Sequence, residues 1–156
     1  MFRTLIASWA LVASAVVHGA VERETFEVSV TIPAADFYVL PVDPQLVLRQ
    51  QRLAYNSVTS QLSTLRAPFD VKNASGGIGA RLAEEAYLSN GFERIDLQVK
   101  FNGVPLNLDQ SEVLTFADAR PGKRVNLEIA AIKPEDDYVP GNYFGTVHMV
   151  FDAIAP

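Results

Sequence analysis

Short segments in which apolar and polar residues alternate are the feature of this sequence that most limits its fold. A period of two residues is typical of a β-strand with one buried and one solvated face. The clearest segments are 65–72, 95–101 and 125–131, and turn residues rich in Gly, Pro and Asn separate them. Asn102-Gly103 follows the second segment directly, and this dipeptide favours a tight hairpin turn. No sustained helical period competes, so the sequence predicts an all-β sandwich.

Several less regular stretches carry further predictions. Residues 46–48 are expected to form a short strand, and residues 83–88 a loop with at most one helical turn. Residues 143–151 are expected to form a long final strand, whose mixed second face suggests neighbours on both sides. Pro68 has no N–H for a ladder hydrogen bond, so its strand is placed near a sheet edge or at a bulge.

Residues 1–20 have the pattern of a secretory signal peptide. A short basic start precedes an apolar run over 5–17, and small residues close the segment. The run is too short for a comfortable membrane span. We expect cleavage after Ala20, with cleavage after Gly19 or retention as an anchor as the alternatives.

The mature chain then opens with an isolated strand, VERETFEVSVTIP, at 21–33. Apolar residues at alternate positions form one face of this strand: Phe26, Val28, Val30 and Ile32. Pro33 ends it, since proline cannot donate to a ladder. With no neighbour before it, the strand either folds back into its own sheet or completes the sheet of another molecule. We favour the second.

The composition argues against most catalytic and metal-binding chemistry. The chain has no Cys, which excludes thiol nucleophiles, Cys metal sites and disulfides. Without Arg3 of the signal peptide, the mature chain has 12 basic and 18 acidic residues. We therefore expect no basic surface that binds nucleic acid. His148 is then the only His, and Glu135-Asp136-Asp137 lacks the spacing of a calcium loop. We therefore expect no enzyme, cofactor or metal site, and treat the glycosylation sequon at Asn73 as a chance match.

Three stretches together resemble a known family. They are the start of the mature chain through Pro33, the segment from Ala80 through the Asn102-Gly103 hairpin, and the C-terminal part. The most specific residues lie in the last stretch: Gly141, Asn142, Tyr143, Gly145, Val147, Met149 and Phe151. The chain thereby resembles the major pilins of alpha-fimbriae, the coli-surface-antigen and colonization-factor-antigen type of chaperone–usher pili.

The resemblance implies that residues 34–156 form an incomplete immunoglobulin-like β-sandwich, completed by the donor strand 21–33 of the next subunit. It also implies head-to-tail fibres of pilin subunits, a periplasmic chaperone, an outer-membrane usher and a fimbria on the cell surface that serves adhesion. A host-surface receptor is left open. In the relatives the apolar alternation lies one residue earlier, so the cleavage site or the docking register differs here. A minor or tip subunit, or a free periplasmic module that binds carbohydrate or protein, is the alternative function.

Overall fold

The structure is a computed structural model that describes residues 36–156. The predicted signal peptide (1–20) and donor strand (21–33), with Phe26, Val28, Val30 and Ile32, lie outside the described residues. The strands are β1 (Phe37–Pro41), β2 (Tyr55–Asn56), β3 (Gln61–Leu62), β4 (Leu65–Asn73), β5 (Gly77–Leu82), β6 (Tyr87–Ser89), β7 (Arg94–Phe101), β8 (Val104–Pro105), β9 (Ser111–Leu114), β10 (Lys123–Ala131) and β11 (Met149–Ile154). The helical elements are the 3-10 helix η1 (Pro44–Leu46) and α1 (Phe116–Ala119). Within residues 36–156, neither is long or apolar enough to cross a membrane.

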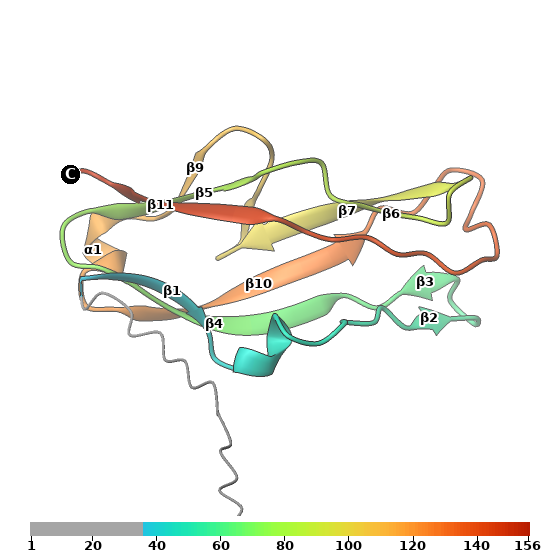
Figure 1. Ribbon diagram of the computed structural model, residues 1–156, viewed down its shortest axis with the longest axis horizontal. Coiled ribbons are helices and arrows are strands. Elements are labelled where there is room, and N and C mark those ends of the chain that lie inside the picture. The colour runs from blue at the N-terminus through green and yellow to red at the C-terminus, as the bar shows by residue number, and fades with distance from the viewer. Residues whose placement is uncertain (1–35) are drawn as a thin grey trace, which may run out of the picture. The chain divides into compact units, whose positions relative to one another are not determined.

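Two antiparallel sheets face each other across a shared core (Figure 1). The larger sheet has the strand order β1-β4-β10-β7-β6, with β8 attached to β7, and the smaller has the order β11-β5-β9. β2 and β3 pair with each other as a separate small hairpin. The predicted all-β sandwich is confirmed.

The alternating segments build the core because every second side chain points between the sheets. Along β7 exposed and buried residues alternate, and the apolar side chains from Ile95 to Phe101 are the buried ones. The fully buried ring of Phe101 contacts Phe69 of β4 and Phe151 of β11, with ring centroids 5.5 and 4.8 Å apart. These aromatic contacts join the two sheets near the middle of the domain.

The hairpin predicted at Asn102-Gly103 joins β7 to β8. Asn102 and Gly103 have φ angles of 51° and 77°, the left-handed pair that a two-residue turn requires. The side chain of Asn102 also donates to the Val113 carbonyl at 2.8 Å, which attaches the turn to β9.

The prediction of a strand at 46–48 is wrong, because the local sequence favours a helical turn. Asp43 precedes η1, and its carboxylate accepts the backbone N–H of Gln45 at 2.9 Å. Pro44 supplies the fixed φ of a first helical position. Val47 and Leu48 follow the turn and are exposed.

Residues 83–88 contain no helical turn either. The N–H of Ala83 donates to the His148 carbonyl at 2.9 Å, and the Ala86 carbonyl accepts from Leu97 at 2.9 Å. These backbone groups bond to neighbouring segments, and β6 begins at Tyr87 by pairing with Asp96. Tertiary pairing therefore overrides the local helix propensity.

β4 is not an edge strand, although it contains Pro68. It lies between β1 and β10, and Asn126 of β10 is the partner of Pro68. The Pro68 carbonyl accepts from Val42, just beyond the end of β1. Because the N and O of one strand residue point to the same side, the missing N–H faces the end of β1, and the ladder to β10 loses no bond.

Candidate functional site

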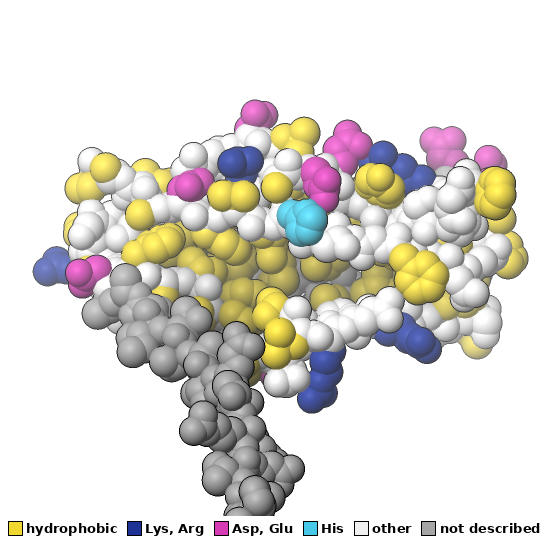
Figure 2. Space-filling view, in the orientation of Figure 1, with side chains coloured by type: hydrophobic (Ala, Val, Ile, Leu, Met, Phe, Trp, Pro, Cys, Tyr) yellow, Lys and Arg dark blue, Asp and Glu magenta, His cyan; other side chains and the backbone are white. Residues whose placement is uncertain are grey.

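Two sheet edges flank an open seam on one side of the sandwich. β1 pairs only with β4 and β11 pairs only with β5 among the described residues, so each strand ends its sheet. A groove with a volume of about 1430 Å³ lies between the chain that follows β1 and the chain that leads into β11. Figure 2 shows hydrophobic side chains exposed in this hollow, between the two layers of the domain.

The floor of the groove is apolar and is shared by four strands of the larger sheet. Its residues come from β4, β6, β7 and β10: Leu65, Phe69, Leu88, Ile95, Leu97, Leu127 and Ile129. Leu46 and Leu53 add to it from the segment between β1 and β2, which we call the A-side lip (residues 44–55). No Asp or Glu lines the groove in the described part of the chain. The groove therefore suits an apolar face.

The opposite border is the chain that leads into β11, residues 138–149, which we call the F-side lip. The long strand predicted over 143–151 is shorter than expected: regular pairing begins at Met149, and before it Phe144 makes an isolated bridge with Ser89. The predicted second neighbour is absent among the described residues, because β11 pairs with β5 alone. The unpaired side of this chain borders the groove.

The residues of the C-terminal family motif lie together on this lip. All of them line the groove except Phe151, which packs on Phe101: Gly141, Asn142, Tyr143, Gly145, Val147 and Met149. Gly145 permits a close approach, since a Cβ there would lie 2.1 Å from the Tyr87 carbonyl oxygen. The hydroxyl of Tyr143 donates to the Val139 carbonyl at 2.7 Å, which closes the turn at the start of the lip.

The two lips meet at one end of the groove through Tyr55 and Tyr138. Their rings are 6.1 Å apart and nearly perpendicular, a favourable edge-to-face arrangement. Burial, followed by the nearby Asp137 carboxylate, raises the pKa of the Tyr138 phenol. This contact could not be predicted from the sequence, because both residues lie in segments without regular alternation.

The A-side lip carries two arginines, Arg49 and Arg52, which line the groove and are exposed. The side chain of Gln51 donates to the carbonyls of Leu46 and Arg49, at 3.1 Å each, and so fixes the lip locally. In the described part of the chain, neither arginine has a carboxylate within 4.0 Å.

Two further residues singled out by the sequence, His148 and Asn73, lie in different surroundings. His148 is exposed on the F-side lip, and its Nδ1 lies 2.8 Å from Glu84. Asn73, the sequon residue, is buried, donates to the Gly77 carbonyl at 2.6 Å and accepts from Ser75 at 3.1 Å. A glycan on this amide would break the β4–β5 turn. Within residues 36–156, no cluster of three His, Cys, Asp or Glu could hold a metal ion.

Comparison with known proteins gives the family. The family model described as "CS1 type fimbrial major subunit" matches residues 22–152. This chain belongs to that family. It is a structural pilus subunit and forms part of a fimbria on the cell surface. The CS1 type fimbrial subunits are structural proteins, so the family gives no support for an enzyme.

A solved structure agrees with this assignment at the level of the fold. The CooA pilin subunit from enterotoxigenic Escherichia coli is similar with a TM-score of 0.55 and 18% sequence identity, over 64% of this chain and 75% of that one. No curated protein sequence matches. The predicted family and the predicted pilin fold are both confirmed for this CS1 type subunit.

Proposed function

We propose that the groove is the acceptor site for the N-terminal strand of another subunit, and that the fimbria grows by this donor-strand exchange. The observation that carries the proposal is the groove, whose floor is apolar and whose two lips are the segments that follow β1 and precede β11, each of these strands being the last of its sheet. Unpaired strand edges beside an apolar surface are costly and readily accept an added strand. Residues 21–33 supply a strand with one apolar face.

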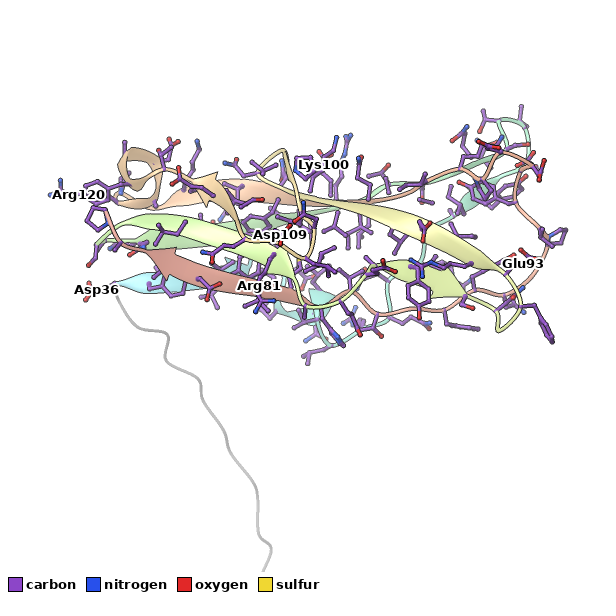
Figure 3. All side chains as sticks on the ribbon, turned by 90° about the horizontal axis from the view of Figure 1, so that it is seen from above. Asp36, Arg81, Glu93, Lys100, Asp109 and Arg120 are labelled. Atoms are coloured by element: carbon purple, nitrogen blue, oxygen red, sulfur yellow. The ribbon has the colours of Figure 1, made fainter. Side chains whose placement is uncertain are left out.

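The domain's geometry supports insertion from a second copy over folding back. The end of β11 and the start of β1 contact the same turn: Ala74 donates to the Asp36 carbonyl, and Gly76 lies directly against Ile154. Figure 3 shows Asp36 at one end of the domain with Arg120, and Glu93 at the other end.

A strand inserted by its own chain must end at Asp36, and would therefore run parallel to β11. The missing last strand of an immunoglobulin-like fold is antiparallel to its partner. Antiparallel pairing is also slightly more stable per residue. The N-terminal strand of another copy can take this direction, so we propose head-to-tail assembly, which yields a filament because it does not close.

The strand and the groove agree in length. From Phe26 to Ile32 there are six residue steps, about 20 Å at roughly 3.3 Å each. The F-side lip, at eleven steps, is long enough to border this strand, and its part from Tyr143 to Met149 spans six steps. Burial of four apolar side chains would contribute about 6–12 kcal/mol as an upper bound.

The route to the fibre follows from the same groove. Residues 1–20 act as a signal peptide for export, and a periplasmic chaperone covers the groove until the subunit reaches an outer-membrane usher. There the donor strand of the next subunit replaces the chaperone. An exported chain with this groove open would otherwise expose apolar surface and a free edge.

The test uses the mature chain without residues 21–32, coexpressed with its chaperone. A synthetic peptide of residues 21–33 is then added. We expect the peptide to displace the chaperone and leave a heat-resistant complex, whereas a peptide with Val28→Asp does not. A truncated domain that is stable alone and ignores the peptide would show that the fold was already complete.

A further inference from the structure

We infer that Arg49 and Arg52 form a basic lip that recognises Glu27 of the incoming strand and thereby sets its register in the groove. This inference rests on the donor-strand function proposed above. The partner is a second copy of this chain, and the contact pairs its acidic side chain with two guanidinium groups that have no carboxylate partner within the described domain.

The charges at the groove are arranged asymmetrically. Arg49 and Arg52 lie on the A-side lip, whereas the F-side lip carries His148, which is paired with Glu84. Figure 2 shows basic side chains on one side of the hollow and an acidic side chain beside the histidine on the other. The apolar floor between the lips has no ionisable side chain that could compete for a charge. An acidic group above the groove is therefore attracted to one lip.

The donor segment offers one such group at a defined place. In FEVSVTI, residues 26–32, Glu27 is the only ionisable residue. It alternates with the apolar face, so its side chain points out of the groove when Phe26 and Val28 point in. A guanidinium group beside a carboxylate gives a charge-assisted hydrogen bond, stronger than a neutral one.

The apolar face alone does not fix the register. A slip by one residue turns the wrong face inward and is strongly disfavoured. A slip by two residues keeps an apolar face inward, since Val28 and Val30 are identical and the groove floor is continuous. Such a slip moves Glu27 by about 7 Å, out of reach of the same guanidinium group. The charge contact therefore distinguishes registers between which the apolar contacts discriminate weakly.

The experiment uses full-length fibres made with the chaperone and usher. One variant exchanges two outward-facing residues, Glu27→Thr with Thr31→Glu, so composition and net charge stay the same, and the carboxylate could return to the arginines only by a slip of four residues. We expect its fibres to dissociate at a lower denaturant concentration than wild-type fibres at low salt. The difference should largely vanish at about 1 M salt, where the Debye length is about 3 Å. The double substitution Arg49→Gln and Arg52→Gln should lower the denaturation midpoint by a similar amount. In fibres that carry this double substitution, the exchange should not change the midpoint further.

A charge reversal covers the case in which the exchange variant forms no fibres. Glu27→Lys should reduce fibre yield, and Arg49→Glu with Arg52→Glu should restore it. Equal midpoints for wild type and the exchange variant at low salt would overturn the inference. So would an exchange effect that persists without the two arginines. Failure of the donor-strand function itself would appear in the wild type: its chains would form no fibres, and its truncated domain would not bind the donor peptide. The comparison between variants tests only the charge contact.

Discussion

The substitution Val147→Asp tests the groove from the acceptor side. Val147 is half-buried on the F-side lip and packs against the core, and a donor strand would cover it further. The change removes a valine contact of about 1.5–3 kcal/mol. It also places a carboxylate without a partner in an apolar groove, for which about 1–3 kcal/mol more is expected. The sum is about 2.5–6 kcal/mol, which is at least about a seventyfold loss of affinity for the donor peptide.

The matched control is Thr146→Asp, one residue earlier on the same lip. Thr146 also borders the groove, but its side chain is exposed, so a charge there stays hydrated and should cost less than about 0.5 kcal/mol. The assay is peptide binding to the truncated domain, measured by displacement of the chaperone. Circular dichroism of each chaperone complex checks that the variant has folded. Equal losses for the two variants, or a larger loss for Thr146→Asp, would refute the assignment of this lip to the groove.

Three further outcomes test the domain itself. Asn73→Ala should lower the free energy of unfolding by about 2–3 kcal/mol in urea titrations, because Gly77 and Ser75 lose a buried partner; an unchanged midpoint would contradict this. Phe101→Ala should cost about 3–5 kcal/mol in the same assay, since its ring joins both sheets, and a loss below 1 kcal/mol would refute that role. The side chain of Arg124 holds the pKa of Asp70 below its usual range. That pair should stabilise the fold above the ordinary Asp pKa of about 3.9 and cease to do so as the pH falls through the lowered value. Asp70→Asn should therefore flatten the acid limb of a pH–stability curve, and an unchanged limb would count against the pair.

The sequence predicts the strands of the fold best where alternation and turn chemistry agree. The segments at 65–72, 95–101 and 125–131 became β4, β7 and β10, and the Asn102-Gly103 turn is where the dipeptide placed it. The predictions failed where a local interaction or a distant partner decided the backbone. Asp43 caps a helical turn at the start of residues 46–48, where a strand was predicted. Pairing with β7 holds the end of residues 83–88 as a strand, although these residues favour a helix.

The groove could be predicted only in part. The C-terminal motif was identified from the sequence, and most of it lies on the F-side lip. The A-side lip was not identified, because residues 44–55 show no alternation and the partner of each side chain is distant in the chain. Whether a strand ends a sheet is a property of topology, since the same alternation fits an edge strand and an interior one. Pro68 illustrates this: a residue typical of edges lies in an interior strand, at the point where its neighbour ends.

The open seam also ties the stability of the domain to assembly. The chain has no Cys, so no disulfide compensates for an absent strand. If the donor strand comes from another copy, the apolar contacts that complete each core lie between subunits, and the folded state gains stability by binding. A substitution on either lip then weakens the fibre and the subunit together, whereas a substitution on the outer face of β7 affects neither. Comparing fibre dissociation with unfolding of the isolated domain across such variants would separate the two effects. A close correlation for lip variants alone is the result that coupled folding and assembly requires.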